Sequence, residues 1–263
     1  MQQLLLLFST KLVYWATRLP LHSIARIIAW FVKKYDVNMS EAKEQDLAQY
    51  EHFNAFFTRE LDMSKRPMSD AEVVSPVDGK IATHGQIDDD TLLQAKGHTY
   101  SLTALLGSLD WSEPYEQGSY LNIYLSPRDY HRIHMPMDGK LLRCRRIPGT
   151  LFSVSPKTAQ SVKGLFARNE RVVAEFEGSQ GKFSMVLVGA VNVRAIDTVW
   201  QQKLTPAQNR KIEDYDTPDI RLAKGEEMGR FNMGSTVILV FEKGYQFAGE
   251  FGDEVKVRAN VLA

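Results

Sequence analysis

The stretch Met233-Gly234-Ser235-Thr236-Val237-Ile238-Leu239-Val240-Phe241 decides the fold of this 263-residue chain. Its last five residues are all apolar, so neither face of the extended segment suits water. This pattern predicts a central strand that is buried on both sides. The small and hydroxyl-bearing residues Gly234, Ser235 and Thr236 come immediately before the apolar run. We therefore expect them at the mouth of a buried strand.

Segments with strand character recur on the N-terminal side of this run, and turn residues separate them. They are residues 73–75, 80–83, 120–125, 140–147, 171–176 and 183–193, with residues 236–241 as the last of the series. Short strands with little helix between them predict a β-rich, barrel-like or sandwich-like domain. Residues 200–222 are polar and contain proline, which favours a long loop or an insertion.

The N-terminal part of the chain is cationic and has helical character. Residues 1–35 contain five Lys or Arg and no Asp or Glu, and Pro20 divides them into two short amphipathic helices. No apolar run reaches the roughly 20 residues that span a bilayer. We expect a segment that lies in the interface of an anionic membrane; the alternative is a helical hairpin packed on the protein's own core.

Residues 40–61 predict a further amphipathic helix, with Ser40 as its N-cap. The expected fold class is therefore α+β. Short N-terminal amphipathic helices form a membrane-associating region at residues 1–62, and a β-rich domain follows at residues 63–263.

The overall charge and the cysteine content exclude some classes of function. Lys plus Arg equals Asp plus Glu, with 32 of each, which gives no support for a nucleic-acid partner. Cys144 is the only cysteine, so an internal disulfide is excluded. Its arginine neighbours favour a thiolate, but a strand position without a catalytic role is the better interpretation.

Three short segments carry the residue types that chemistry needs: SPVDG at residues 75–79, YHRIHMP at 130–136 and GRFNMGST at 229–236. Each alone is weak evidence, because Asp-Gly is a common turn and two His residues three apart are often structural. Together they resemble the phosphatidylserine decarboxylase family. The resemblance extends over residues 50–263: residues 53–61 are similar to the family's N-terminal helix segment, residues 148–154 and 165–171 to its central strands, and residues 224–231 lead into its processing site.

The resemblance implies a self-cleaving proenzyme that makes its own pyruvoyl cofactor and needs no metal. Ser235 attacks the carbonyl of Gly234, and the resulting ester eliminates to a dehydroalanine, which hydrolyses to the pyruvoyl group. The products are a β chain of residues 1–234 and an α chain of residues 235–263. The family's assisting Asp and His fall on Asp78 and His134. The residue that acts during decarboxylation falls on His131.

The residue chemistry agrees with these roles. A serine hydroxyl needs a base to take its proton; His134 is the candidate base, and Asp78 is the candidate group that orients its imidazole. Gly234 has no Cβ and leaves room for the attack. The pyruvoyl carbonyl forms a Schiff base with the amine of phosphatidylserine and accepts the electrons left by CO2, and His131 then protonates the product carbon.

The lipid substrate is an anion, so cationic side chains are candidates for binding its headgroup. Arg128, Arg132 and Lys157 are the candidates. The buried strand predicted at residues 236–241 would keep the two cleaved chains associated. The resemblance also implies a homodimer at the cytoplasmic face of a bacterial inner membrane.

The sequence departs from the family pattern at three places. Met233 replaces a leucine of similar volume, Ser155 stands where Asn is common, and Arg194-Ala195 replaces Gly-Ser. If Arg194 lines the pocket, it contacts the headgroup or obstructs it. Another lipid amine is therefore one alternative substrate.

Two alternatives belong to other classes of function. One is a non-catalytic membrane-binding β module, in which Gly234-Ser235 is inert. The other is a zinc-dependent hydrolase that uses His131, His134 and either Asp129 or Asp138.

Overall fold

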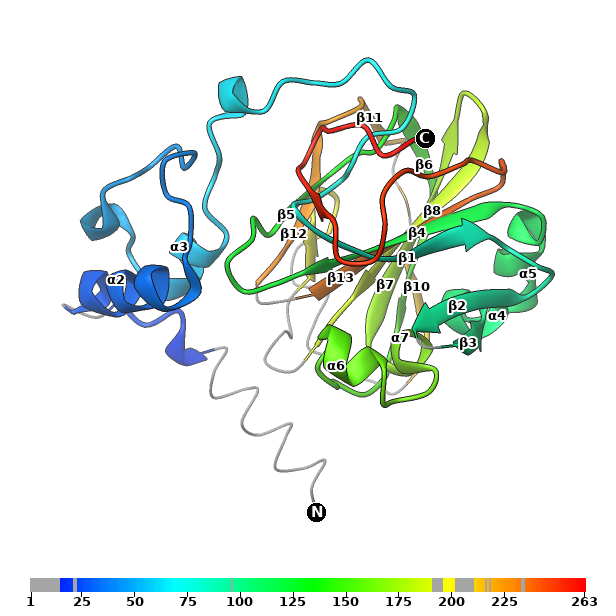
Figure 1. The fold of residues 1–263 in the computed structure, drawn as a ribbon, viewed down its shortest axis with the longest axis horizontal. Helices are drawn as coiled ribbons and strands as arrows, with labels where there is room; N and C mark the ends of the chain where they lie inside the picture. The colour runs from blue at the N-terminus through cyan, green and yellow to red at the C-terminus, as the bar shows by residue number, and fades with distance from the viewer. Residues whose placement is uncertain are drawn as a thin grey trace.

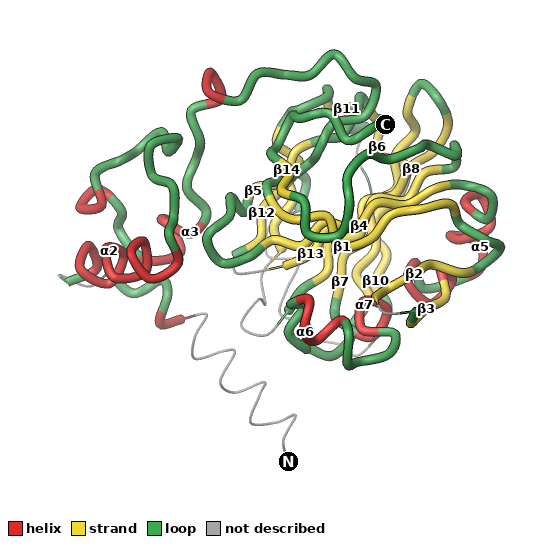
Figure 2. Tube along the Cα trace, in the orientation of Figure 1, coloured by secondary structure: helices red, strands yellow, loops and turns green. Residues whose placement is uncertain are grey.

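The structure is a computed structural model, and it describes residues 15–20, 23–95, 97–190, 196–201, 211–215, 217, 219–232 and 235–263. A helical N-terminal unit lies beside a body made of strands, as Figures 1 and 2 show. The strands form sheets that are not closed into a barrel, so the α+β prediction is confirmed with a sandwich-like body.

The main sheet of the described chain has nine antiparallel strands. Its order is β10-β6-β7-β8-β13-β4-β1-β14, and β11 also pairs with β6. The bounds are β1 Gly79–Gln86, β4 Ser119–Leu125, β6 Gly139–Ile147, β7 Arg171–Gly178, β8 Gly181–Val188, β10 Glu213–Tyr215, β11 Arg221–Leu222, β13 Ser235–Phe241 and β14 Glu254–Val255.

Two smaller sheets accompany it. One has the order β5-β12-β9, with β5 Arg132–His134, β12 Glu227–Phe231 and β9 Ile196–Thr198. The other pairs β2 Thr91–Ala95 with β3 His98–Ser101. The short helices of the body are α4 Leu102–Leu106, α5 Leu109–Ser112, η3 Glu113–Tyr115, α6 Pro156–Ala159 and α7 Leu165–Arg168.

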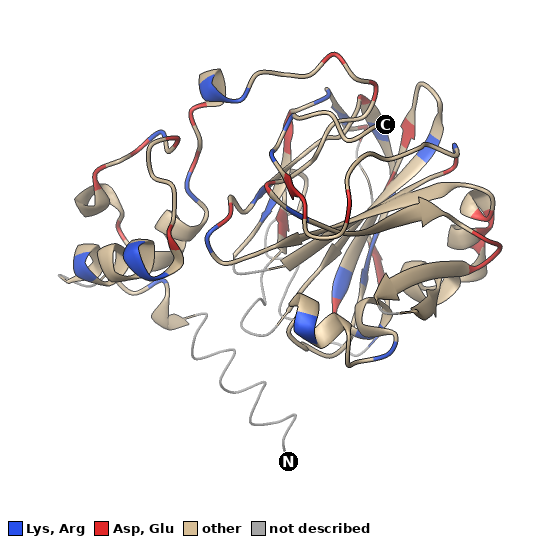
Figure 3. Cartoon of the chain, in the orientation of Figure 1, with Lys and Arg blue, Asp and Glu red and all other residues tan. Residues whose placement is uncertain are grey.

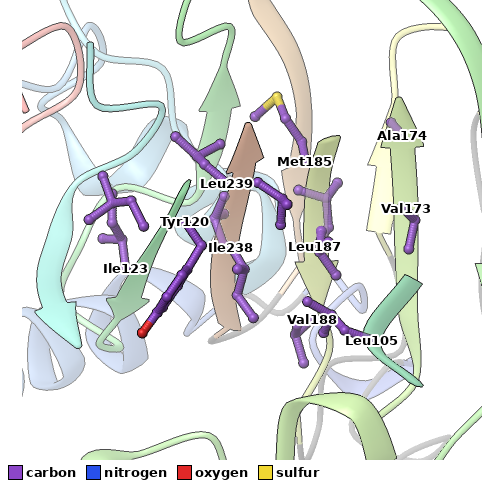
Figure 4. Packing of buried hydrophobic residues seen from close by; sticks show 14 of the residues in the cluster. Leu105, Tyr120, Ile123, Val173, Ala174, Met185, Leu187, Val188, Ile238 and Leu239 are labelled. Carbon is purple, nitrogen blue, oxygen red and sulfur yellow. The ribbon is translucent and has the colours of Figure 1, made fainter. Parts of the chain in front are cut away.

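Strand β13 is the centre of the main sheet, as its apolar run predicts. It pairs with β4 on one side and β8 on the other, and all seven of its residues are buried. Figure 4 shows why both faces must be apolar: Ile238 and Leu239, neighbours on β13, pack among side chains of β4 and β8. Ser235, the first residue of β13, pairs with Leu125 of β4, and from Thr236 onward the strand also pairs with β8, so backbone ladders hold the strand on both sides immediately after Ser235.

The N-terminal unit has its own small core. Helix α2 (Ile24–Tyr35) buries Ile24, Ile28 and Phe31, and Phe31 packs against aromatic residues of α3 (Phe53–Phe57). Helix α2 begins at Ile24, four positions after Pro20, and corresponds to the second helix predicted in residues 1–35; most of the first lies outside the described residues. The domain boundary at residues 62–63 stays a prediction.

Several sequence predictions are wrong. Residues 40–61 are not one helix capped by Ser40: they contain η1 (Leu47–Gln49) and α3, and η2 (Met63–Lys65) follows. The side chain of Asp46 caps η1, and His52 Nδ1 accepts a hydrogen bond from the Ala55 N–H at 2.9 Å, so new helices begin at these points.

Four strand or loop predictions also need correction. Residues 165–168 form helix α7 rather than a strand, and residues 151–154 have no regular structure. Residues 73–75 contribute only a bridge between Val74 and Asn260. The region 200–222 includes β10 and β11, which extend the main sheet through β6.

Candidate active site

Ser235 is the first residue of β13 and pairs with Leu125 of β4. Its side chain is fully buried, and its hydroxyl has no hydrogen-bond partner among the described residues. Leaving a buried hydroxyl unpaired costs about 1–3 kcal/mol, so such an atom in a native fold suggests a reactive group. Its chain neighbours Met233 and Gly234, and with them the predicted cleavage bond, lie outside the described residues.

The imidazole of His131 is buried, and only its Nδ1 has a hydrogen-bond partner among the described residues. Nδ1 lies 2.8 Å from the carbonyl oxygen of Asp129. Because a carbonyl only accepts, Nδ1 carries the proton and Nε2 is a bare acceptor. Nε2 has no partner in the described part of the chain, and the ring packs 4.1 Å from the ring of Phe57. Burial lowers the pKa of His131 to about 3, so the ring is neutral near pH 7.

His134 is also buried, but both of its ring nitrogens are engaged. Nδ1 donates to the carbonyl oxygen of Gly225 at 2.9 Å, so Nε2 must accept from the hydroxyl of Tyr130, also at 2.9 Å. Burial lowers the pKa of His134 and raises the pKa of Tyr130. Both groups are therefore neutral, which fixes one tautomer and one direction for this hydrogen bond.

Asp78 does not contact His134 in this structure. Its carboxylate accepts from both terminal nitrogens of Arg66, at 3.0 and 2.9 Å, and from the Val257 N–H at 2.8 Å. The expected hydrogen bond between Asp78 and His134 is thus not formed. Arg66 also binds Glu41 of the N-terminal unit at 2.8 Å. Asp78 consequently joins the N-terminal unit to the C-terminal segment, and its role in cleavage stays a prediction.

Two residues of this site, Arg66 and Tyr130, were not among the sequence candidates. Tyr130 lines two clefts: one also contains Asp78, Arg59 and Arg66, and the other also contains His134 and Arg132. Tyr130 directly precedes His131 in the sequence, which is the one signal that pointed to it. Nothing in the sequence connects Arg66 with Asp78.

The three candidate cations differ in how far their charges are already neutralised. Arg132 pairs with Glu60 and Glu227, at 3.1 and 2.9 Å. Arg128 pairs with Glu254. Lys157, on α6, is exposed and has no ion pair with a described residue. Arg194 lies outside the described residues.

The residues of the zinc alternative do not gather at one point. His134 has both nitrogens occupied, the Asp129 carboxylate accepts from Ser126, and Asp138 accepts from the Lys224 N–H. Over the described ranges, no group of three or more His, Cys, Asp or Glu side chains is close enough to share an ion.

Cys144 lies in β6 and is buried, as the interpretation of a non-catalytic strand residue requires. Burial raises the pKa of its thiol to about 12, so the neighbouring arginines do not produce a thiolate.

Comparison with known proteins shows to which family the chain belongs. A family profile described as phosphatidylserine decarboxylase matches residues 53–263. The chain is 53% identical over 220 residues to a phosphatidylserine decarboxylase proenzyme of Dechloromonas aromatica (strain RCB), covering 82% of this chain and 78% of the relative. It is 49% identical over 255 residues to one of Methylobacillus flagellatus, covering 91% of each. A proenzyme of the same name from Shewanella amazonensis is 49% identical over 240 residues, covering 88% of this chain and 83% of the relative. The chain belongs to the phosphatidylserine decarboxylase family.

Proposed function

We propose that this protein decarboxylates phosphatidylserine to phosphatidylethanolamine, after cutting itself between Gly234 and Ser235. The observation that carries the proposal is the Ser235 hydroxyl, which is buried and unpartnered among the described residues at the start of the central strand. Family membership and the proenzyme names of the relatives support both parts of the proposal.

In the proposed self-cleavage, the Ser235 hydroxyl is the nucleophile. Its oxygen bonds to the Gly234 carbonyl carbon while the Gly234–Ser235 peptide bond breaks; a base takes the hydroxyl proton, and the leaving nitrogen of residue 235 gains one. A base then removes the Cα proton of residue 235 as the ester oxygen leaves its Cβ, so Gly234 becomes a carboxylate and residue 235 a dehydroalanine. Water adds to the remaining dehydroalanine and ammonia departs, which leaves a pyruvoyl group at the head of residues 235–263.

His134 is the proposed base for this step. Its Nε2 accepts from Tyr130, so it must exchange this hydrogen bond for one with the Ser235 hydroxyl. Nδ1 remains bound to the Gly225 carbonyl, and this contact stabilises the imidazolium that forms. Asp78 contributes through position, because it holds the C-terminal segment through the Val257 N–H.

Two buried polar atoms are not committed to structural hydrogen bonds. The Ser235 hydroxyl, where the pyruvoyl group would form, and His131 Nε2 both lack a partner in the described chain, which suits such a group. When formed, the group supplies an electron sink for the pair left by CO2. His131 is the proposed proton donor to the product carbon. Its Nε2 must first gain a proton, and the anionic headgroup favours this by raising the pKa of a nearby imidazole.

We also propose that the N-terminal unit binds an anionic membrane. Helix α2 buries one face, while Ile27 and Trp30 on its other face are 39% and 58% exposed. Lys33 and Lys34 lie in the last turn of the same helix, and Figure 3 shows basic positions, in blue, along the ribbon of this helix. No helix in the described part of the chain has the length and apolar character needed to cross a bilayer. A peripheral location on the cytoplasmic face of the inner membrane, and a homodimer, remain part of the proposal.

Intact-mass spectrometry of the purified protein, in a buffer free of amines and reductants, tests the self-cleavage. We expect two chains, one ending at Gly234 and the other beginning with a pyruvoyl group in place of Ser235. The Ser235→Ala variant should give one whole chain. The same samples are then supplied with vesicles that contain phosphatidylserine, and CO2 release should follow cleavage.

A folded wild-type protein that remains one unmodified chain contradicts the proposal and favours the non-catalytic membrane-binding module. A cleaved protein that releases CO2 only from another lipid amine retains the mechanism but changes the substrate. The substitution Arg194-Ala195 is then the place to examine first.

A further inference from the structure

The N-terminal unit forms hydrogen bonds to the segment that leads into the proposed cleavage site. Asn232 is the last described residue before Gly234, and its carbonyl oxygen accepts a hydrogen bond from Asn54 Nδ2 at 3.0 Å. Its side chain accepts from Arg18 Nη2 at 2.8 Å and donates to Asp197 Oδ2 at 3.1 Å. Asn232 is thus held through its backbone and its side chain, and Arg18 and Asn54 supply two of these hydrogen bonds.

Asn54 is itself held in place. Its N–H donates to the Thr17 carbonyl at 2.9 Å, and its own carbonyl accepts from the N–H and the hydroxyl of Thr58, both at 2.9 Å. Asn54 is 6% exposed, and Asn232 is 4% exposed. The main chain of Asn54 is thus fixed by hydrogen bonds at both its N–H and its carbonyl. Its buried side chain can therefore act as a rigid support for Asn232.

The helix that carries Asn54, α3, also contacts His131, the proposed proton donor. Phe57, three positions later on α3, packs against the His131 ring, and the His131 carbonyl accepts from the Phe231 N–H at 2.9 Å. Figure 1 shows α3 on the side of the N-terminal unit that faces β5 and β12, the strands that follow His131 and precede Asn232. One short helix outside the sheets therefore contacts both segments of the proposed active site.

We propose that Asn54 is a positioning residue for self-cleavage, which fixes the backbone at Asn232 so that the Gly234 carbonyl meets the Ser235 hydroxyl. This inference rests on the proposed function. Without the Asn54 donor, a buried carbonyl two residues from the scissile bond loses its partner. The segment then samples other positions, and a displacement of about 1 Å can slow a reaction about a hundredfold.

The test is the rate of self-cleavage of Asn54→Asp, followed from synthesis in a cell-free system at several pH values. The ionised Asp has no proton to donate and repels the Asn232 carbonyl, so we expect cleavage about ten- to a hundredfold slower than wild type near pH 7. A protonated Asp donates an O–H in place of the lost N–H. Burial raises the pKa of a carboxyl above its usual value of about 3.9, so the rate of Asn54→Asp relative to wild type at the same pH should recover as the pH falls.

That recovery separates positioning from a general loss of structure. Asn54→Ala lacks any donor, so it should be slow at every pH. Gln45→Glu is the matched control, because Gln45 Nε2 also donates to a main-chain carbonyl, that of Ser40, but at an exposed site of the same unit. This control should cleave at the wild-type rate.

Wild-type rates for Asn54→Asp across the pH range overturn the inference while leaving the proposed function intact. A wild-type chain that never cleaves overturns the proposed function instead. If Asn54→Asp shows no cooperative thermal unfolding, Asn54→Ala decides: slow cleavage by a folded variant supports the positioning role, and a wild-type rate contradicts it.

Discussion

Arg66 and Asp78 form a buried ion pair whose side chains are 5% and 7% exposed. Breaking such a pair leaves an uncompensated charge, which costs about 3–5 kcal/mol. We expect Arg66→Gln to lower the free energy of unfolding by about this amount in urea titrations. A Ser235→Ala background keeps every molecule whole during the measurement. Lys43→Gln, which removes an exposed pair with Glu60, is the control and should cost under about 1 kcal/mol. Equal, small losses for both variants would mean that the Arg66–Asp78 junction contributes little.

His131 makes the stability depend on pH in a direction that follows from its burial. Its pKa is about 3 in the folded protein and about 6.5 when unfolded. Between these values the unfolded chain takes up a proton that the folded chain refuses. The free energy of unfolding therefore falls as the pH drops, by at most about 1.4 kcal/mol per pH unit for this group. In the same Ser235→Ala background, His131→Gln should show a shallower decrease from about pH 6.5 downward. An unchanged slope would show that His131 is protonated as readily in the folded state as in the unfolded one.

Among the elements, the central strand was predicted well because its signal is local. The run at residues 237–241 is apolar at every position, and only a strand covered on both faces satisfies that pattern. The predicted helix over residues 40–61 failed for the opposite reason. Its aromatic residues have helical spacing, but Phe53, Phe56 and Phe57 use that spacing on one short helix to pack against Phe31 of α2. The caps supplied by Asp46 and His52 were the available signal for the breaks.

The sequence did not predict the hydrogen-bond partners within the site, because contacts between separate elements determine them. The sequence motifs predicted Asp78, His131, His134 and Ser235 as site residues. They did not predict the hydrogen-bond partners of Asp78 and His134. Those partners come from three separate segments, at Arg66, Gly225 and Val257, together with Tyr130. Hydrogen bonds of this kind depend on how β5, β12 and the C-terminal segment pack, and a sequence pattern does not specify such packing.

At the scale of the whole molecule, we propose that the outer face of α2 brings the protein to the membrane that holds its substrate. A basic residue near an anionic membrane surface contributes about 1 kcal/mol. Replacing both Lys33 and Lys34 by Gln should therefore weaken binding to vesicles that contain phosphatidylserine by about thirtyfold at low salt. Flotation of the protein with vesicles measures this, and added salt should reduce the difference between the variant and wild type.

The control variant removes the same charge from the β-rich body, at exposed Lys163 and Lys211. If net charge alone attracts the protein, both double variants lose binding equally, and α2 has no special role. If α2 is the docking surface, the control binds as wild type does, while Trp30→Ala weakens binding to anionic and neutral vesicles alike. Because α2 packs on α3, and α3 supports Asn232 and His131, a docked α2 also places the proposed active site close to the lipid that it is expected to decarboxylate.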